Sequence, residues 1–171
     1  MIGPAKFDAP RYELRLPGGR FVTLRALTPE EALRLGEAIA AIDPWRAYGY
    51  PASALRRMLA AHEAGAPRFA VLVEGNVVGA AVIRTAWLRG PYLQFLALLP
   101  EAQGRGIGTA FLEWMEREAR AGDERNLWVA ASEINVDAIR FYERHGFIRV
   151  AALDDLVHDN RTELLLRKRL V

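Results

Sequence analysis

Apolar and polar residues alternate along several short segments of the chain, which is the pattern of half-buried β-strands. Residues 12–16 and 21–26 carry this alternation on either side of Pro17-Gly18-Gly19, so they predict a hairpin. Further strands are predicted at residues 69–73, 77–87, 92–99, 127–131, 147–153 and 162–168.

Start and stop signals between the strands mark four helices. Thr28, Pro29 and Glu31 combine a capping box with a proline at the first helical position, and Asp43-Pro44 ends the helix that follows. The other helices are predicted from about residue 53 to 64, from the glycine-rich segment to residue 121, and from residue 135 to 145. The aromatic residues 45–51 are predicted to form a loop. Antiparallel strands, a βαβ-like centre and a returning pair of strands indicate an α/β fold with a mixed sheet.

The composition is that of one globular domain over residues 1–171, with 51% hydrophobic and 26% charged residues. A net charge of +2 is too small, and the arginines are too dispersed, to predict a nucleic-acid partner. Residues 1–8 lack a signal-peptide stretch and no apolar run reaches bilayer length, so we expect a cytoplasmic protein without a membrane partner. Without cysteine or ligand spacing among its three histidines, the chain is expected to hold no metal.

The glycine-rich segment between a predicted strand and a predicted helix has the features of an anion site. The first N–H groups of a helix have no partner within it, and the helix dipole adds positive charge there. Glycines allow a phosphate to approach these groups, and Arg105 adds a full charge. The spacing fits neither the dinucleotide fingerprint nor the nucleotide P-loop. The simpler interpretation is that Gly104, Gly106 and Gly108 only make a tight connection.

Two motifs resemble the signatures of the GNAT superfamily of acyl-CoA-dependent N-acetyltransferases. Gln103, Gly106 and Gly108 match the Arg/Gln-x-x-Gly-x-Gly/Ala signature that opens the helix after the central strand. The second motif lies one helix and one strand further along, and its matching residues are Asn135, Ala138, Tyr142, Gly146 and Phe147. The resemblance covers residues 71–150 well, whereas the first sixty residues match only in the order of their elements.

The resemblance implies a mixed, mostly antiparallel sheet of six to seven strands with about four flanking helices, splayed where acyl-CoA binds. It implies acetyl-CoA as the cosubstrate, with its pyrophosphate on the glycine-rich segment and its pantetheine arm along the preceding strand. A backbone N–H of Leu98 or Leu99 is then the donor to the developing oxyanion. The expected cofactor-binding residues are Leu98, Leu99, Gln103, Gly104, Arg105, Gly106, Ile107, Gly108, Thr109, Asn135, Ala138 and Tyr142.

By the same resemblance, Tyr142 is the acid that protonates the leaving thiolate; otherwise it is an aromatic packed under the sheet. Many relatives carry a Glu on the central strand as the base, but Gln94 stands here and cannot accept a proton in that way. Glu133 is the next candidate base, although a solvated loop charge is the simpler interpretation of this residue. Deprotonation through water would need no dedicated base.

The acceptor site is expected in the loops around the cleft. Trp45, Tyr48 and Tyr50 either form one wall of it, where they stack on a cation, or plug the core beneath the first helices. Gln94 and His158 are the other expected substrate contacts, and Asp43, Asp154 and Asp155 lie on neighbouring loops.

Two functional hypotheses therefore stand. In the first, an acetyl group passes from acetyl-CoA to a primary amine of a small molecule or protein by direct attack in a ternary complex. In the second, the chain is an acyl-CoA-binding sensor with little turnover, which the absence of a Glu at position 94 favours. Either protein is expected to be a monomer or a homodimer.

Overall fold

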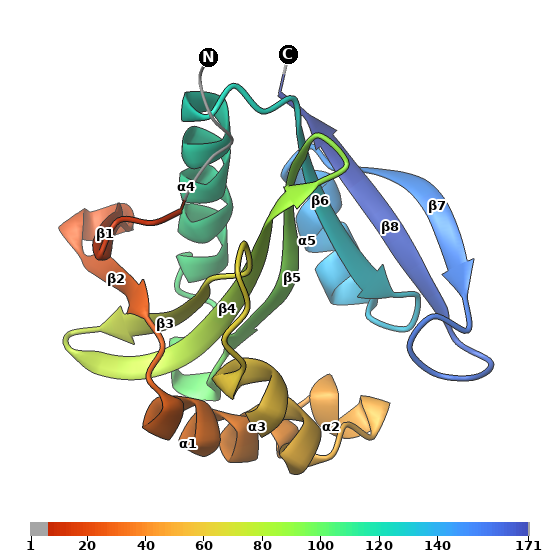
Figure 1. Ribbon diagram of the computed structural model, residues 1–171, viewed down its shortest axis with the longest axis horizontal. Helices are drawn as coiled ribbons and strands as arrows, with labels where there is room; N and C mark the ends of the chain where they lie inside the picture. Colours follow the sequence, from red (N-terminus) through yellow and green to blue (C-terminus); the bar gives the residue numbers. More distant parts are fainter. Residues whose placement is uncertain (1–6, 171) are drawn as a thin grey trace.

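The computed structural model describes residues 7–170, which form one eight-stranded sheet with helices on both faces (Figure 1). The strands are β1 (Arg11–Arg15), β2 (Phe21–Ala26), β3 (Arg68–Val73), β4 (Asn76–Trp87), β5 (Gly90–Leu98), β6 (Asn126–Ser132), β7 (Ile148–Asp154) and β8 (Thr162–Arg169). The α-helices are α1 (Pro29–Ala40), α2 (Trp45–Tyr48), α3 (Ala52–Ala60), α4 (Ile107–Ala121) and α5 (Val136–Arg144), with short 3-10 turns η1 (Pro17–Gly19) and η2 (Pro100–Ala102).

The mixed, mostly antiparallel fold predicted from the sequence is confirmed, but the element counts of six to seven strands and about four helices are wrong. Residues 7–170 form eight strands, at the eight segments predicted from the sequence, where the resemblance implied six or seven. They form five α-helices, because the residues predicted as an aromatic loop include the single turn α2. The second predicted helix also ends early, at Ala60 and well before Gly65. Each remaining predicted strand and helix appears within a few residues of its expected bounds.

The strand order in the sheet is β1-β2-β3-β4-β5-β6-β8-β7, and every neighbouring pair is antiparallel except β5 and β6. A single crossover through α4 joins these two parallel strands, as parallel pairing requires. The pair is short: Tyr92 lies opposite Trp128, Leu93 lies opposite Val129, and the pairing then stops. Figure 1 shows β6 diverging from β5 beyond this point.

A β-bulge at Gln94 coincides with the end of that pairing. On the neighbouring strand β4, Val82 pairs with Phe95 and Ile83 pairs with Leu93, so Gln94 has no partner in the register. A bulge bends its strand and increases the local twist. It also changes which face the next residues occupy, because Leu93 packs in one core cluster and Phe95 in the other. The bulge therefore turns β5 away from β6 and opens the sheet.

Two hydrophobic clusters cover opposite faces of the sheet. Phe111, Met115 and neighbouring residues of α4 are almost fully buried against β1–β3 and β8. Leu35 and Ile39 of α1 are equally buried with residues of α3, β4 and β5 on the other face. Burying such side chains contributes roughly 1.5–3 kcal/mol each, so these two layers hold the flanking helices in place.

Residues 1–6, on which the expectation of a missing signal peptide partly depends, lie outside the described residues. Within residues 7–170, no helix combines the length and the apolar character that crossing a bilayer would require. No cluster of three or more His, Asp or Glu side chains in the same residues is arranged to hold a metal ion.

The capping box at the start of α1 is formed as the sequence predicts. The Glu31 N–H donates to Thr28 Oγ1 (3.2 Å) and the Thr28 N–H donates to Glu31 Oε2 (3.0 Å). Arg25 on β2 adds two hydrogen bonds to the same carboxylate, at 2.9 and 2.6 Å. Chiefly through Arg25, this environment lowers the pKa of Glu31 to about 2. Glu31 therefore ties the first helix to the sheet.

We expect Glu31→Gln to lower the free energy of unfolding by about 1 kcal/mol at pH 7, because it removes the ion pair with Arg25, while the amide oxygen can still accept from the Thr28 N–H. The pKa of Glu31 is lower in the folded state than in the unfolded state, so the contribution of its carboxylate to stability is complete above about pH 4.5. It is lost as the pH falls towards about 2. Urea denaturation from pH 7 down to pH 3 measures the trend. Glu30→Gln, which changes an exposed carboxylate in the same turn, is the matched control, and equal effects of the two variants would contradict the assignment.

Candidate active site

The opening between β5 and β6 forms a cleft of about 1030 Å³. Side chains and backbone of both strands line it, together with the N-terminal ends of α4 and α5, the α2 segment and the β7–β8 loop. Most residues that the sequence singled out are brought together here: Trp45, Tyr48, Tyr50, Gln94, Leu98, Gln103, Gly104, Gly106, Ile107, Gly108, Thr109, Asn135, Ala138, Tyr142 and His158. Leu99, Arg105 and Glu133 are not part of its lining.

The N-terminal end of α4 points its free N–H groups into this cleft. The Ala110 N–H donates to the Gly106 carbonyl (3.0 Å), which leaves the N–H groups of residues 107–109 without a place in the helical ladder. Gly106 has a φ of 81°, a conformation that side chains disfavour. A Cβ on Gly108 would lie 3.1 Å from the Phe141 ring, so this glycine allows α5 to approach α4. The segment is thus shaped to receive an anion.

The end of β5 presents backbone groups to the same cleft. The side chain of Gln103 donates to the Leu98 carbonyl (2.9 Å), which fixes the loop to the strand end. The Leu99 N–H donates to the Val78 carbonyl (2.8 Å) on β4, and successive residues of a strand point to opposite edges. The backbone of Leu98 therefore faces the opened edge. Of the two predicted oxyanion donors, the geometry favours Leu98 over Leu99.

The second motif forms α5, which closes the cleft from the side of α4. Asn135 caps this helix by accepting from the Ala138 N–H (3.2 Å). The ring of Tyr142 packs against Phe141 and Phe147, and its edge lines the cleft. Burial raises the pKa of the Tyr142 hydroxyl well above its usual value, so the hydroxyl keeps its proton at neutral pH.

Aromatic side chains line the other half of the cleft. The Tyr50 ring lies 5.4 Å from the His158 ring and 6.3 Å from the Tyr48 ring. Trp45 instead packs on Phe95, 5.4 Å away, so it contributes to the core as well as to the cleft. Gln94 Oε1 and His158 Nε2 are buried and have no hydrogen-bond partner among residues 7–170. Since buried polar atoms are normally paired, both are free to meet a bound molecule.

Glu163 on β8 is a cleft residue that the sequence analysis missed. Burial is the main cause that raises the pKa of its carboxyl, while Ser132 and Arg161 act in the opposite direction. The predicted base, Glu133, is exposed and lies outside the cleft lining. The one available signal was the position of Glu163 between Thr162 and a run of three leucines, where a charged residue is unusual inside a strand.

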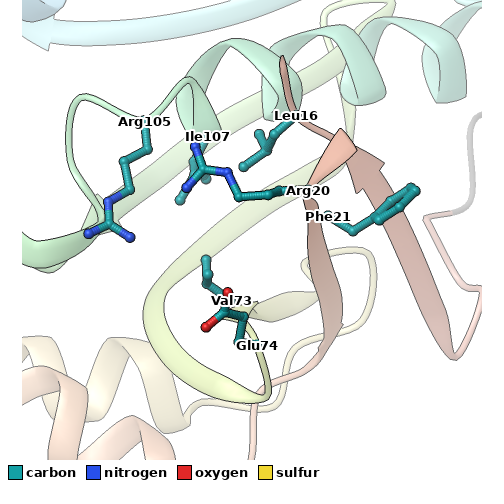
Figure 2. A pocket seen from close by; sticks show the side chains of 7 residues that line it. All are labelled: Leu16, Arg20, Phe21, Val73, Glu74, Arg105 and Ile107. Atoms are coloured by element: carbon teal, nitrogen blue, oxygen red, sulfur yellow. The ribbon is translucent and has the colours of Figure 1, made fainter. Parts of the chain in front are cut away.

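Arg105 lines a separate pocket of about 110 Å³ between the β1–β2 turn and the loop before α4. Figure 2 shows Arg20 reaching from the β1–β2 turn towards Ile107 at the start of α4 and Arg105 in the loop before it, while Glu74 comes from the β3–β4 turn. The positive charge of Arg105 thus lies beside the α4 end, outside the large cleft. Its contact with a bound phosphate stays a prediction.

Known proteins resemble this chain in sequence and in fold. The chain is 29% identical over 98 residues to streptothricin acetyltransferase A of Bacillus subtilis, a match that covers 57% of this chain and 56% of that protein. The chain spans about half the length of the curated relatives it matches first.

Two solved structures show the same fold. The ribosomal-protein-S18-alanine N-acetyltransferase of Escherichia coli superimposes with a TM-score of 0.67 at 17% identity, over 87% of this chain and 94% of that one. A candidate streptothricin acetyltransferase of Bacillus anthracis, in complex with acetyl coenzyme A, has a TM-score of 0.55 at 18% identity and covers 63% and 64% of the two chains. The model of the acetyltransferase (GNAT) family matches residues 32–147, which include both motifs and both strands of the cleft. The chain therefore belongs to the GNAT family of acetyltransferases, whose cosubstrate is acetyl-CoA.

Proposed function

We propose that this protein transfers an acetyl group from acetyl-CoA to a primary amine by direct attack in a ternary complex. The observation that carries the proposal is the single cleft between β5 and β6, which is lined by the N-terminal end of α4 on one side and by aromatic side chains on the other. Both substrates can therefore meet without a covalent enzyme intermediate. Holding two reactants in one geometry supplies much of the rate enhancement in such a reaction.

The donor half of the cleft fits acetyl-CoA. The N–H groups of residues 107–109 would hold the pyrophosphate, and the open edge of β5 would pair with the amides of the pantetheine arm. The Leu98 N–H would then donate to the thioester oxygen as negative charge develops there. Tyr142, which keeps its proton at neutral pH, would protonate the departing thiolate.

The acceptor half suits an amine that arrives as a cation. Tyrosine faces attract an ammonium group, and Glu163 adds a carboxylate to the same region. Streptothricin is the named acceptor of two curated relatives, and the chain spans only part of each of them. Streptothricin is thus one primary amine to test alongside alkyl amines, polyamines and peptide N-termini.

An amine panel tests the function directly. With acetyl-CoA in excess, we expect at least one primary amine to increase thiol release over the rate with acetyl-CoA alone, with the acetylated amine detected by mass spectrometry. If coenzyme A binds but no amine releases thiol, the acyl-CoA sensor is the better description. The Gln at position 94 is the observation that keeps this second function in view.

Gly106→Asp should weaken the binding of coenzyme A by at least about 100-fold, because it places a negative charge and a strained backbone beside the pyrophosphate. Isothermal titration calorimetry measures the change. Gly65→Asp is the matched control, because Gly65 also has a positive φ (74°) and lies between α3 and β3, outside the lining of both pockets. Unchanged affinity in the Gly106 variant would remove the helix end from the donor site.

Tyr142→Phe should lower kcat by about 100-fold while leaving the affinity for coenzyme A within a factor of about two. The substitution removes the proton donor and retains the ring that packs on Phe147. Steady-state kinetics with the best amine of the panel, together with calorimetry, separates the two effects. Tyr12→Phe, outside the cleft, controls for loss of a tyrosine hydroxyl, and wild-type turnover in the Tyr142 variant would exclude the acid role.

A further inference from the structure

Glu163 lies on the sheet face opposite the donor half of the cleft. Ser132 on β6 pairs with Glu163 on β8 across the ladder, and directly opposite residues place their side chains on the same face. The next residue, Leu164, points to the other face, where it packs in the cluster that includes α4. Glu163 therefore reaches the gap from the side away from α4 and Tyr142.

Tyrosines from three segments surround this carboxylate. Tyr48 of α2, Tyr50 of the α2–α3 connection and Tyr92 of β5 line the same cleft, and each interacts electrostatically with Glu163. Burial raises the pKa of all three hydroxyls, so they stay neutral at physiological pH. A carboxylate among neutral aromatic rings is an arrangement that attracts an ammonium group.

Other charged groups face the same carboxylate. Arg161 from the β7–β8 loop lowers the pKa of Glu163, and Glu133 from the end of β6 raises it. Ser132, which is 5% exposed and lies opposite Glu163 in the sheet, also lowers the pKa of the Glu163 carboxyl. The β7–β8 loop brings His158 into the cleft, and β7 places Leu153 opposite Glu163 in the sheet. Arg161 lines the cleft as well, where its guanidinium donates to the Tyr48 carbonyl (3.4 Å), and within residues 7–170 it forms no ion pair with Glu163.

We propose that Glu163, with Tyr48, Tyr50 and Tyr92, forms the acceptor's ammonium site and that Glu163 is the general base of the reaction. This inference rests on the proposed acetyl transfer. It assigns to β8 a task that Gln94 on β5 cannot perform, and it replaces Glu133, which is exposed and outside the cleft. The substrate class is a primary alkyl amine that is protonated at neutral pH, bound by its ammonium group.

The proton balance is complete with the groups present. Glu163 takes one proton from the ammonium, and the free amine nitrogen attacks the thioester carbon, forming the C–N bond. The tetrahedral species collapses with cleavage of the C–S bond, and Tyr142 protonates the thiolate. The amide nitrogen loses its extra proton, which returns to Tyr142 through solvent, and Glu163 releases its proton to solvent. The base and the acid act from opposite sides of the gap, next to the nucleophile and the leaving group respectively.

The test compares Glu163→Gln with the wild type, using the alkyl amine of the panel that reacts fastest. We expect kcat/KM for the amine to fall by about 100-fold or more at pH 7, with little change in the KM for acetyl-CoA. The variant can use only the free amine, whose fraction rises tenfold per pH unit below its own pKa. The ratio of wild-type to variant kcat/KM for the amine should therefore fall by about tenfold per pH unit between pH 7 and 9.

Two further variants make the comparison specific. Glu133→Gln tests the rival carboxylate on the adjoining loop, and Glu113→Gln, on the exposed face of α4 and outside the cleft, is the matched control. Thermal unfolding checks that Glu163→Gln folds. Because the folded pKa of Glu163 is raised, its ionisation destabilises the wild type above that pKa, so the variant should be at least as stable at pH 7. Glu163→Asp keeps a carboxylate, so its rate should be independent of pH once that carboxylate is ionised, although lower than the rate of the wild type.

Several results would overturn the inference while leaving acetyl transfer intact. These are a Glu163→Gln variant with wild-type kcat/KM, a deficit of the same size at every pH, and a pH-dependent loss in Glu133→Gln alone. A wild-type protein that acetylates no amine would instead refute the proposed function, and the base assignment with it.

Discussion

The short parallel pairing of β5 with β6 is the constraint on which the site depends. Two residue pairs hold the strands together, and the bulge at Gln94 then turns β5 away. A longer stretch of pairing would close the sheet and remove the cleft. If the two strands did not pair at all, the two halves of the sheet would come apart. The packed layers on either face keep the opening in place, because α4 is buried on one side and α1 with α3 on the other.

In the proposed reaction, the groups that act on the acyl donor and those that act on the amine approach this opening from opposite faces of the sheet. The helix end of α4 lies towards one side of the opening and Glu163 towards the other. Tyr48 and Tyr92 line the cleft between them and interact electrostatically with both Glu163 and Tyr142. The backbone of Leu98 faces the gap between them, fixed by its hydrogen bond from Gln103. An acyl group entering from one face and an amine entering from the other would meet at this strand edge. Such an arrangement needs no movement of a catalytic group across the sheet.

Local signals in the sequence were sufficient for most of the elements and for the residues expected in the donor half of the site. Thr28 and Glu31 marked a helix start that the structure forms with both capping bonds. The glycine-rich segment and Asn135 each mark the start of a helix, and the effect of each depends on the backbone groups of the residues next to it. Such features depend on a few consecutive residues, so they can be read without the fold. The short helix α2 escaped prediction because four residues carry too little periodicity to stand out.

The sequence by itself determined that the chain is an α/β protein with a GNAT signature, and it located the glycine-rich turn and Tyr142, which both line the cleft. Only the tertiary structure decided which carboxylate reaches the cleft. Glu133 directly follows β6 and Glu163, 30 positions later, lies on the neighbouring strand β8, and only Glu163 lines the cleft. The physical reason is strand pairing: the register of β6 with β8 sets the face and depth of each side chain. That register follows from long-range packing, which no local pattern in the chain records.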